Sequence, residues 1–327
     1  MEERPNAPAS GSETGPGLGS NAGIVREVVR CRNCGLCRGV RRALDLALGL
    51  AGAGWNVFTD GELVHNPGVL RDLAGRGVRV WDGEERSWGP RDCILIRAHG
   101  IGPERRAFLL RLGCPLFDGT CPEVARVAGK IRRGKFHGRG LLLFGDGEHP
   151  ETRGLMAHGG ENLRVVRDSS DLDRLGDFTE RQPFLLLAQT TADEGEFAEL
   201  GRDLLQRFPA SQIDDTICAS TRIRRAELDQ LLQNCPFDAV VVLGGLHSAN
   251  TLRLAAAARA AGLWTLHAED AAALAETVPF SAMRVLLASG TSTPEEVVDA
   301  AERALRGHFS CPGPGGDSAF PEARAQD

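Results

Sequence analysis

Residues 121–154 read CPEVARVAGKIRRGKFHGRGLLLFGDGEHPETRG, and this stretch indicates the class of the fold. A cysteine opens a segment with amphipathic helical spacing (121–133), an apolar run (140–145) then predicts a strand, and a polar loop follows. Further apolar runs end at glycine or small polar residues in the same way, at 55–59, 79–81, 93–98, 184–191, 239–245 and 284–290. This alternation predicts an α/β fold with parallel sheets that are buried on both faces.

Three cysteines recur at the same place in this alternation. Each stands where a loop becomes an amphipathic helix. Cys37, Cys121 and Cys218 are separated by 84 and 97 residues, which matches a repeating unit of roughly ninety residues. We therefore expect three α/β units that converge on a centre, each contributing one cysteine. Their predicted bounds are 25–120, 121–216 and 217–306.

The composition limits the function classes. The flanks, 1–24 and 307–327, are rich in Pro, Gly and Ser and are predicted to be disordered. The 327 residues carry a net charge of -6 with scattered Lys and Arg, so nucleic acid is not an expected partner. The sequence contains neither an apolar run of membrane-spanning length nor a secretory signal pattern. We expect a cytoplasmic protein that does not interact with membranes.

The nine cysteines suggest metal binding, because an odd number of widely spaced thiols does not suit a disulfide framework. A helix N-terminus lowers the pKa of a thiol and so favours the thiolate that binds metal. Three such ligands, Cys37, Cys121 and Cys218, suit an iron-sulfur cluster with one open iron, whereas a structural zinc site usually has four ligands. The alternative for each cysteine alone is a small apolar core residue.

Other cysteines fit that alternative better. Cys93, Cys114 and Cys235 stand in or beside apolar runs and are predicted to be core residues. Cys31 and Cys34 form a C-x-x-C-x-x-C run with Cys37 that resembles part of a ferredoxin motif. Its usual fourth cysteine is missing, so we predict that both are bystanders; binding of a second metal, or protection of the cluster, remains the alternative.

Polar residues follow the predicted strands, at the sheet edge where α/β proteins usually bind ligands. The candidates are His65, His99, His149, Glu151, Thr190, Ser248, Asn250 and Ser292. Imidazole, hydroxyl and amide groups are donors that suit an anionic, phosphorylated substrate. A single loop histidine is more often a surface residue, and a serine before a helix, such as Ser292, is often only an N-cap.

Nine motifs resemble, in order and approximate spacing, the hydroxymethylbutenyl diphosphate reductases, also called the LytB family. The resemblance covers about residues 30 to 306, and its motifs are GLCRGVRRAL, LVHNPGVLRDL, RAHGIG, DGTCPEV, HPETRG, AQTT, DDTICAST, HSAN and ASGTSTP. It implies a trefoil of three α/β domains around a central 4Fe-4S cluster held by Cys37, Cys121 and Cys218. It also implies that Glu151 and Thr190 deliver a proton.

The resemblance further implies the substrate and the partners. The diphosphate of 4-hydroxy-3-methylbut-2-enyl diphosphate would lie among His65, His99, His149, Ser248, Asn250 and Ser292. Two electrons from a ferredoxin or flavodoxin would expel water and give isopentenyl or dimethylallyl diphosphate, the last step of the non-mevalonate isoprenoid pathway.

The sequence also departs from the family. Ser248-Ala249-Asn250 stands where a Ser-Ser-Asn triplet is usual, so one hydroxyl donor is missing, and the preceding His247 could replace it. Arg225 stands where the family has Gln. Two alternatives therefore stay open: a paralogous iron-sulfur reductase with a different allylic or phosphorylated substrate, and a non-catalytic metal-binding protein that senses redox state.

Overall fold

The computed structural model describes residues 27–84, 86–181, 183–274 and 284–307. The predicted N-terminal arm (1–24) lies outside these residues. So does the predicted C-terminal tail (307–327), apart from Gly307, which ends the last helix. None of the helices in the described part is long and apolar enough to cross a membrane.

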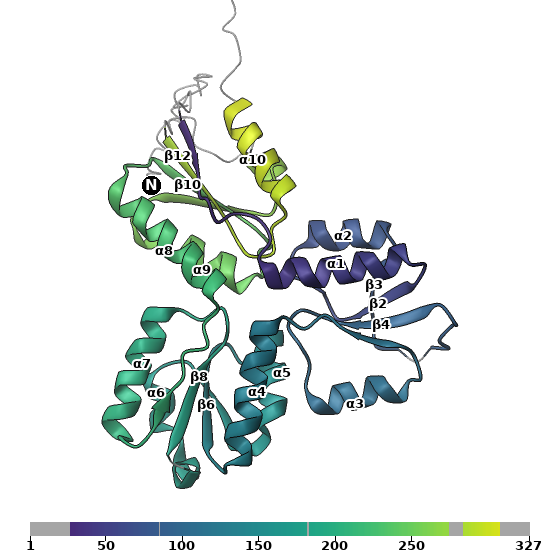
Figure 1. The fold of residues 1–327 in the computed structure, drawn as a ribbon. Helices are drawn as coiled ribbons and strands as arrows, with labels where there is room; N and C mark the ends of the chain where they lie inside the picture. Colours follow the sequence, from purple (N-terminus) through teal and green to yellow (C-terminus); the bar gives the residue numbers. More distant parts are fainter. Residues whose placement is uncertain (1–26, 85, 182, 275–283, 308–327) are drawn as a thin grey trace, which may run out of the picture.

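Three four-stranded sheets form the framework of the molecule, and their strands pair in parallel throughout. The three sheets, each with its helices, lie around a common centre (Figure 1). The predicted α/β class, with three parallel-sheet units around a centre, is confirmed.

The first two sheets are each formed by one continuous stretch of chain. The first has the order β3-β2-β4-β5 and consists of β2 (Asn56–Asp60), β3 (Val78–Trp81), β4 (Asp92–Ile96) and β5 (Leu116–Asp118). The second has the order β7-β6-β8-β9 and consists of β6 (Gly140–Phe144), β7 (Leu163–Val166), β8 (Phe184–Ala188) and β9 (Gln212–Ile213). In both, the chain begins with an inner strand and places the second strand at the edge.

The third sheet contains one strand from the start of the chain. Its order is β1-β12-β10-β11, and it consists of β1 (Glu27–Arg30), β10 (Ala239–Leu243), β11 (Trp264–Ala268) and β12 (Arg284–Ser289). The predicted first unit, 25–120, is therefore wrong at its beginning, because β1 pairs with β12 from Glu27↔Arg284 to Arg30↔Leu287. The other unit boundaries stay predictions.

Helices cover both faces of every sheet. Their bounds are α1 (Arg38–Gly52), α2 (Pro67–Gly75), α3 (Pro103–Arg111), α4 (Pro122–Phe136), α5 (Pro150–Gly159), α6 (Ser169–Asp173), α7 (Glu194–Arg207), α8 (Ala219–Asn234), α9 (Ala249–Ala260) and α10 (Glu295–Gly307). The short 3-10 helices are η1 (Gly160–Asn162), η2 (Gly176–Arg181) and η3 (Ala272–Leu274).

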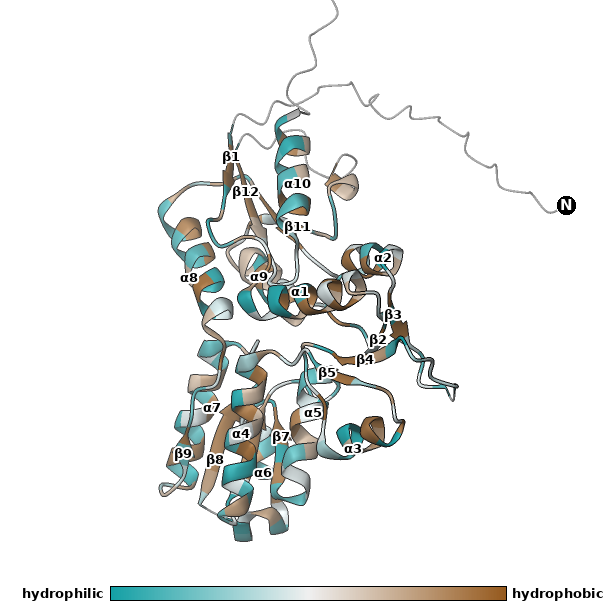
Figure 2. Ribbon diagram, turned by 45° about the vertical axis from the view of Figure 1, so that its right-hand side comes forward, coloured by the Kyte–Doolittle hydropathy of each residue, from teal (hydrophilic) through white to brown (hydrophobic). Residues whose placement is uncertain are grey.

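Each sheet carries a hydrophobic cluster on each face, which explains why its central strands are apolar along their whole length. In the first unit α1 and α2 pack on one face and α3 on the other. In the second, α4 and α5 lie opposite α6 and α7, and in the third α8 and α9 lie opposite α10. Figure 2 shows the result, with hydrophobic colour on strands such as β8 and hydrophilic colour on the outer sides of helices.

The carboxyl ends of the two central strands of each sheet lead into the loops that carry the predicted site residues. β2 and β4 lead to His65 and His99, and β6 and β8 lead to His149 and Thr190. β10 and β12 lead to Ser248 and to Ser292. Parallel pairing brings the ends of neighbouring strands to the same edge of a sheet, so each unit presents its polar loops to the centre.

Candidate active site

Three helices begin at the cysteines that the sequence predicts to be ligands. Cys37 precedes α1, Cys121 precedes α4 and Cys218 precedes α8, each with non-helical backbone at the N-cap position. The amide of Val40 donates a hydrogen bond of 3.4 Å to Sγ of Cys37. The prediction that these cysteines stand at helix N-termini is confirmed.

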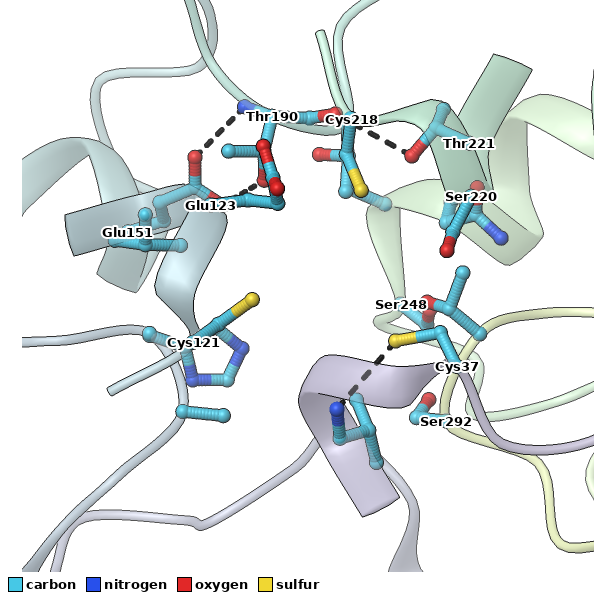
Figure 3. Close-up of a pocket in the computed structure, with 18 of the residues that line it drawn as sticks. Cys37, Cys121, Glu123, Glu151, Thr190, Cys218, Ser220, Thr221, Ser248 and Ser292 are labelled. Carbon is cyan, nitrogen blue, oxygen red and sulfur yellow. Dashed lines mark hydrogen bonds between the residues drawn. The ribbon is translucent and has the colours of Figure 1, made fainter. Parts of the chain in front are cut away.

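The three sulfur atoms point toward one shared space (Figure 3). Gly39, in the first turn of α1, lies so close to this space that an added Cβ would be 2.4 Å from Sγ of Cys121 and 4.0 Å from Sγ of Cys37. Glycine at this position therefore lets α1 approach the second unit without displacing either sulfur.

The thiols of Cys121 and Cys218 are more basic than the sequence predicts. Burial raises the pKa of the Cys121 thiol to about 11, and hydrogen bonds from the first amides of α4 offset only part of this. Burial raises the pKa of the Cys218 thiol for the same reason. The expected lowering by the helix N-terminus is thus outweighed by desolvation. A bound metal would displace the thiol protons, which couples metal binding to proton release.

The three cysteine sulfurs can be compared with the arrangement that a single metal ion needs. Within the described ranges, the one group of three metal-ligand atoms that all lie within 4.8 Å of one another belongs to His65, His99 and His149. The three cysteine sulfurs do not form such a group. One zinc ion, with Zn–S bonds of about 2.3 Å, needs its sulfurs closer than this, whereas a larger iron-sulfur cluster does not.

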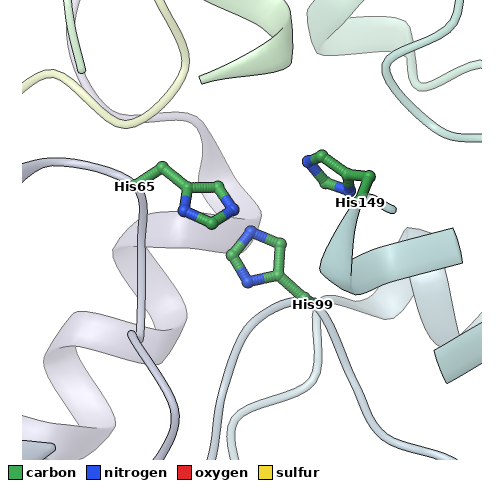
Figure 4. A group of neighbouring side chains, drawn as sticks. All are labelled: His65, His99 and His149. Carbon is green, nitrogen blue, oxygen red and sulfur yellow. The ribbon is translucent and has the colours of Figure 1, made fainter. Parts of the chain in front are cut away.

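The three histidines lie together (Figure 4), and they line the same pocket as the three cysteines. The ring centroids of His65 and His99 are 4.5 Å apart, and His149 lies 5.5 Å and 5.6 Å from them. Burial lowers the pKa of His149 to about 4, and burial lowers the pKa of His99 well below its usual 6.5, with the neighbouring imidazoles adding to both shifts. These two rings are therefore neutral at neutral pH, and they are not surface histidines.

Several buried polar atoms around the histidines have no hydrogen-bond partner among the residues that the structure describes. They are Nε2 of His65, Nδ1 of His99, Nδ2 of Asn250 and Oγ of Ser292. Leaving a buried polar atom unsatisfied costs about 1–3 kcal/mol. Four such atoms from four predicted substrate-binding residues indicate a site built for a polar ligand.

Hydrogen bonds explain the local roles of the remaining polar residues. Ser248 is the N-cap of α9, and its hydroxyl accepts from the amide of Thr251 at 3.5 Å. Ser292 does not cap a helix through its side chain, since its hydroxyl is unpartnered and α10 begins at Glu295. Its carbonyl oxygen accepts from Nδ2 of the buried Asn66 at 3.2 Å, which ties the third unit to the first.

Glu151 and Thr190 form a buried pair at the second unit. The carboxyl group of Glu151 is 3% exposed and accepts from the amide and the hydroxyl of Thr190, both at 2.7 Å. Nδ1 of His149 accepts from the amide of Glu151 at 3.2 Å and so caps α5. Burial raises the pKa of Glu151, although the hydrogen bonds from Thr190 pull it back. A raised pKa suits a group that donates a proton.

All of the predicted site residues line one pocket. They are Cys37, His65, His99, Cys121, His149, Glu151, Thr190, Cys218, Ser248, Asn250 and Ser292. The sequence missed Glu123, Ser220, Thr221 and Thr291, which line the same pocket. The first three stand in the opening turns of α4 and α8, so proximity to the predicted ligands was the signal that could have found them.

Cys31 and Cys34, which the sequence predicts to be bystanders, are not among the residues that line this pocket. Cys31 is buried, and Sγ of Cys34 lies 3.9 Å from the carbonyl oxygen of Leu287. Burial raises the pKa of both thiols. His247 is exposed and does not line the pocket, so its predicted compensation for Ala249 has no support in the structure.

Comparison with known proteins gives a consistent result. The family model described as "LytB protein" matches residues 28–306. The chain is 36% identical over 284 residues to a 4-hydroxy-3-methylbut-2-enyl diphosphate reductase from Opitutus terrae, covering 83% of this chain and 96% of the relative. It is 37% identical over 295 residues to the enzyme of the same name from Nitratidesulfovibrio vulgaris Hildenborough. This match covers 85% of this chain and 98% of the relative.

Solved structures agree with the fold. One of (E)-4-hydroxy-3-methyl-but-2-enyl diphosphate reductase matches with a TM-score of 0.64 and 28% identity, covering 86% of this chain and 99% of that chain. The Plasmodium falciparum reductase structure matches with a TM-score of 0.80, covering 91% of this chain and 95% of that chain. Because its sequence identity is 20%, this match supports the fold alone. Because the family model covers most of the sequence and relatives above 30% identity are matched over nearly their full length, the chain belongs to the LytB protein family.

Proposed function

We propose that this chain catalyses the reductive removal of the hydroxyl group from 4-hydroxy-3-methylbut-2-enyl diphosphate. The products would be isopentenyl and dimethylallyl diphosphate, as the last step of the non-mevalonate isoprenoid pathway. Membership of the LytB family and the names of the matched relatives support this reaction. The observation that carries it is a single pocket in which three cysteine sulfurs face unpartnered, buried polar atoms.

The cysteines are proposed to hold a 4Fe-4S cluster through Cys37, Cys121 and Cys218. The sulfurs come from three different units and do not form a group of metal ligands within 4.8 Å, which supports a cluster over a single ion. When bound, such a cluster supplies electrons and a Lewis-acidic iron. A ferredoxin or flavodoxin is the proposed source of those electrons.

The polar side of the pocket is proposed to bind the diphosphate. Nδ1 of His149 accepts a hydrogen bond, so the proton of its neutral ring is on Nε2, where it can be donated to a phosphate oxygen. Nδ1 of His65 is 3.2 Å from a carboxylate oxygen of Glu62, which leaves the unpartnered Nε2 for the ligand. The negative diphosphate would raise the pKa of His149, because it favours the protonated form of the ring. Ser248, Asn250 and Ser292 would complete the donor set.

Glu151 and Thr190 are proposed to supply a proton. The reaction takes up two electrons and two protons and releases water, so a proton donor is needed beside the substrate. The raised pKa of Glu151 keeps its carboxyl group protonated to a higher pH than an exposed glutamate. The hydroxyl of Thr190, 2.7 Å away, offers the next position for that proton.

The test is anaerobic purification followed by an assay with reduced methyl viologen and 4-hydroxy-3-methylbut-2-enyl diphosphate. We expect a brown, iron-containing protein that oxidises the dye only when the substrate is present. A brown protein without turnover would favour the paralogous reductase, for which the missing hydroxyl at Ala249 is the supporting observation. A colourless protein that contains zinc would contradict both enzyme functions.

A further inference from the structure

Arg224 is a buried cation between two of the proposed cluster ligands. It lies on α8, six residues after Cys218, and is 8% exposed. Its Nη2 donates a hydrogen bond of 2.6 Å to the carbonyl oxygen of Gly35, two residues before Cys37. Its Nε is buried without a partner. One guanidinium therefore links the helix of Cys218 to the loop of Cys37.

The neighbouring arginines of α8 show what Arg224 lacks. Arg222 pairs with Asp215 and Glu194, and Arg225 pairs with Asp193 at 3.1 Å and Asp229 at 2.8 Å. Among the ion pairs of the described residues, none includes Arg224. A guanidinium does not lose its proton in a protein, and burying it without a counter-charge costs several kcal/mol.

Four acidic groups act on Arg224, and two of them belong to proposed cluster ligands. They are the thiols of Cys37, Cys34 and Cys218 and the carboxylate of Glu227. The Glu227 carboxylate is half-exposed and accepts from the amides of Arg32 and Asn33 at 2.6 and 3.0 Å. Burial raises the pKa of Cys34, so its thiol is neutral. Cys37 and Cys218 become fully charged when they bind metal as thiolates, and they would then supply negative charge to Arg224.

We propose that Arg224 is the counter-charge of the cluster and raises its reduction potential. This inference rests on the proposed function, because it requires the cluster. Three thiolates outweigh the positive charge of an oxidised 4Fe-4S core, and an added electron enlarges the excess. A fixed cation beside two of the thiolates stabilises the reduced form more than the oxidised form. Arg224 is thus a positioning residue for electron uptake, and it is not one of the residues that line the substrate pocket.

The test compares Arg224→Gln and Arg224→Lys with a control, Arg222→Gln on the same helix. Glutamine keeps an N–H donor for the Gly35 carbonyl but removes the charge, and lysine keeps the charge. Iron content is measured, and the potential of the cluster is measured by dye-mediated titration with a spectroscopic readout. For Arg224→Gln we expect retained iron and a reduction equilibrium constant about tenfold lower, which is about 59 mV for one electron.

The other variants show which outcomes support the role of Arg224 and which overturn it. Arg224→Lys and Arg222→Gln should keep the wild-type potential. An unchanged potential in Arg224→Gln, or an equal drop in Arg224→Lys, would overturn the counter-charge role. If Arg224→Gln loses iron, then retained iron and potential in Arg224→Lys support the role, and loss of iron in both overturns it. A wild-type protein without iron would instead contradict the proposed function together with this inference.

Discussion

In the proposed reaction, proton delivery depends on the carboxyl group of Glu151. Replacing it in Glu151→Gln keeps the volume and an acceptor for the amide of Thr190 but removes the acidic proton. We expect turnover to fall by about 10²–10⁴-fold, the usual contribution of a positioned acid. Iron content should not change, because Glu151 is not a proposed ligand. Steady-state kinetics and iron analysis measure the two effects.

The control for this variant lies in the loop just before α5. Glu148 is exposed and pairs with Arg153 at 3.4 Å on the surface, so Glu148→Gln should keep wild-type turnover. Undiminished activity in Glu151→Gln would remove the proton-delivery role.

The pH dependence of turnover follows from the same carboxyl group. Burial raises the pKa of Glu151 above its usual 4.5, and the protonated form is the one proposed to be active. The rate should therefore be full below the raised pKa and should fall as the pH rises through it. A kcat profile in the wild type, repeated on the residual activity of Glu151→Gln, checks this. Persistence of the same alkaline fall in the variant would assign it to another group.

Ala249 tests whether the pocket can gain affinity for the diphosphate. Its side chain lines the pocket next to Ser248, where the family has a second hydroxyl. A hydrogen bond to a charged group contributes about 1.5–3 kcal/mol, so Ala249→Ser should lower KM by about tenfold or more. An unchanged or higher KM would indicate that this pocket is shaped for a different substrate.

At the residue scale, the sequence predicts the pocket members that follow strands and misses those that depend on side-chain packing. His65, His99 and His149 were found because each stands just after a predicted strand or its loop. The role of Arg224 could not be found, because burial without a carboxylate partner depends on how α8 packs against the loop at Gly35. The raised thiol pKa of Cys121 was missed for the same reason, since desolvation is a tertiary effect.

At the element scale, central and edge strands differ in how well they are predicted. The six strands with neighbours on both sides, β2, β4, β6, β8, β10 and β12, were all predicted as apolar runs. The missed strands, β1, β5, β7, β9 and β11, all lie at sheet edges. Edge strands are short or partly exposed, such as β9 with both residues exposed, so they lack a continuous apolar pattern.

The first turn of α1 gives a prediction at the same scale. Gly39→Ala would place a methyl group 2.4 Å from Sγ of Cys121, and the helix cannot shift without moving Cys37 as well. We expect a clear loss of bound iron. Gly49→Ala on the same helix has nothing within 4 Å of its new Cβ and should keep its iron, with a stability gain of up to about 1 kcal/mol. Equal iron content in the two variants would show that this close approach does not limit the cluster site.

At the scale of the whole molecule, β1 joins the beginning of the described chain to the sheet formed by its end. Glu27 pairs with Arg284, and their side chains form an ion pair of 2.8 Å, so the first and last described strands share a sheet. Parallel pairing over so long a sequence separation leaves no local pattern, which is why the sequence assigned this strand to the first unit. The number of units and their convergence were predictable, because the cysteine and strand spacing repeats along the chain.

The three proposed cluster ligands come one from each unit, so the proposed cluster needs the whole molecule. Single cysteine variants test whether each unit is required. Cys37→Ala, Cys121→Ala and Cys218→Ala each remove the thiolate of one unit, and we expect each to lose most of its iron. Cys34→Ala should keep wild-type iron, because the Cys34 thiol faces the carbonyl oxygen of Leu287 and its pKa is raised by burial. Iron analysis and the visible spectrum of anaerobically purified protein compare the four variants. A fall in iron in Cys34→Ala would show that the three-ligand assignment is incomplete, whereas retention in any of the other three would remove that unit from the cluster.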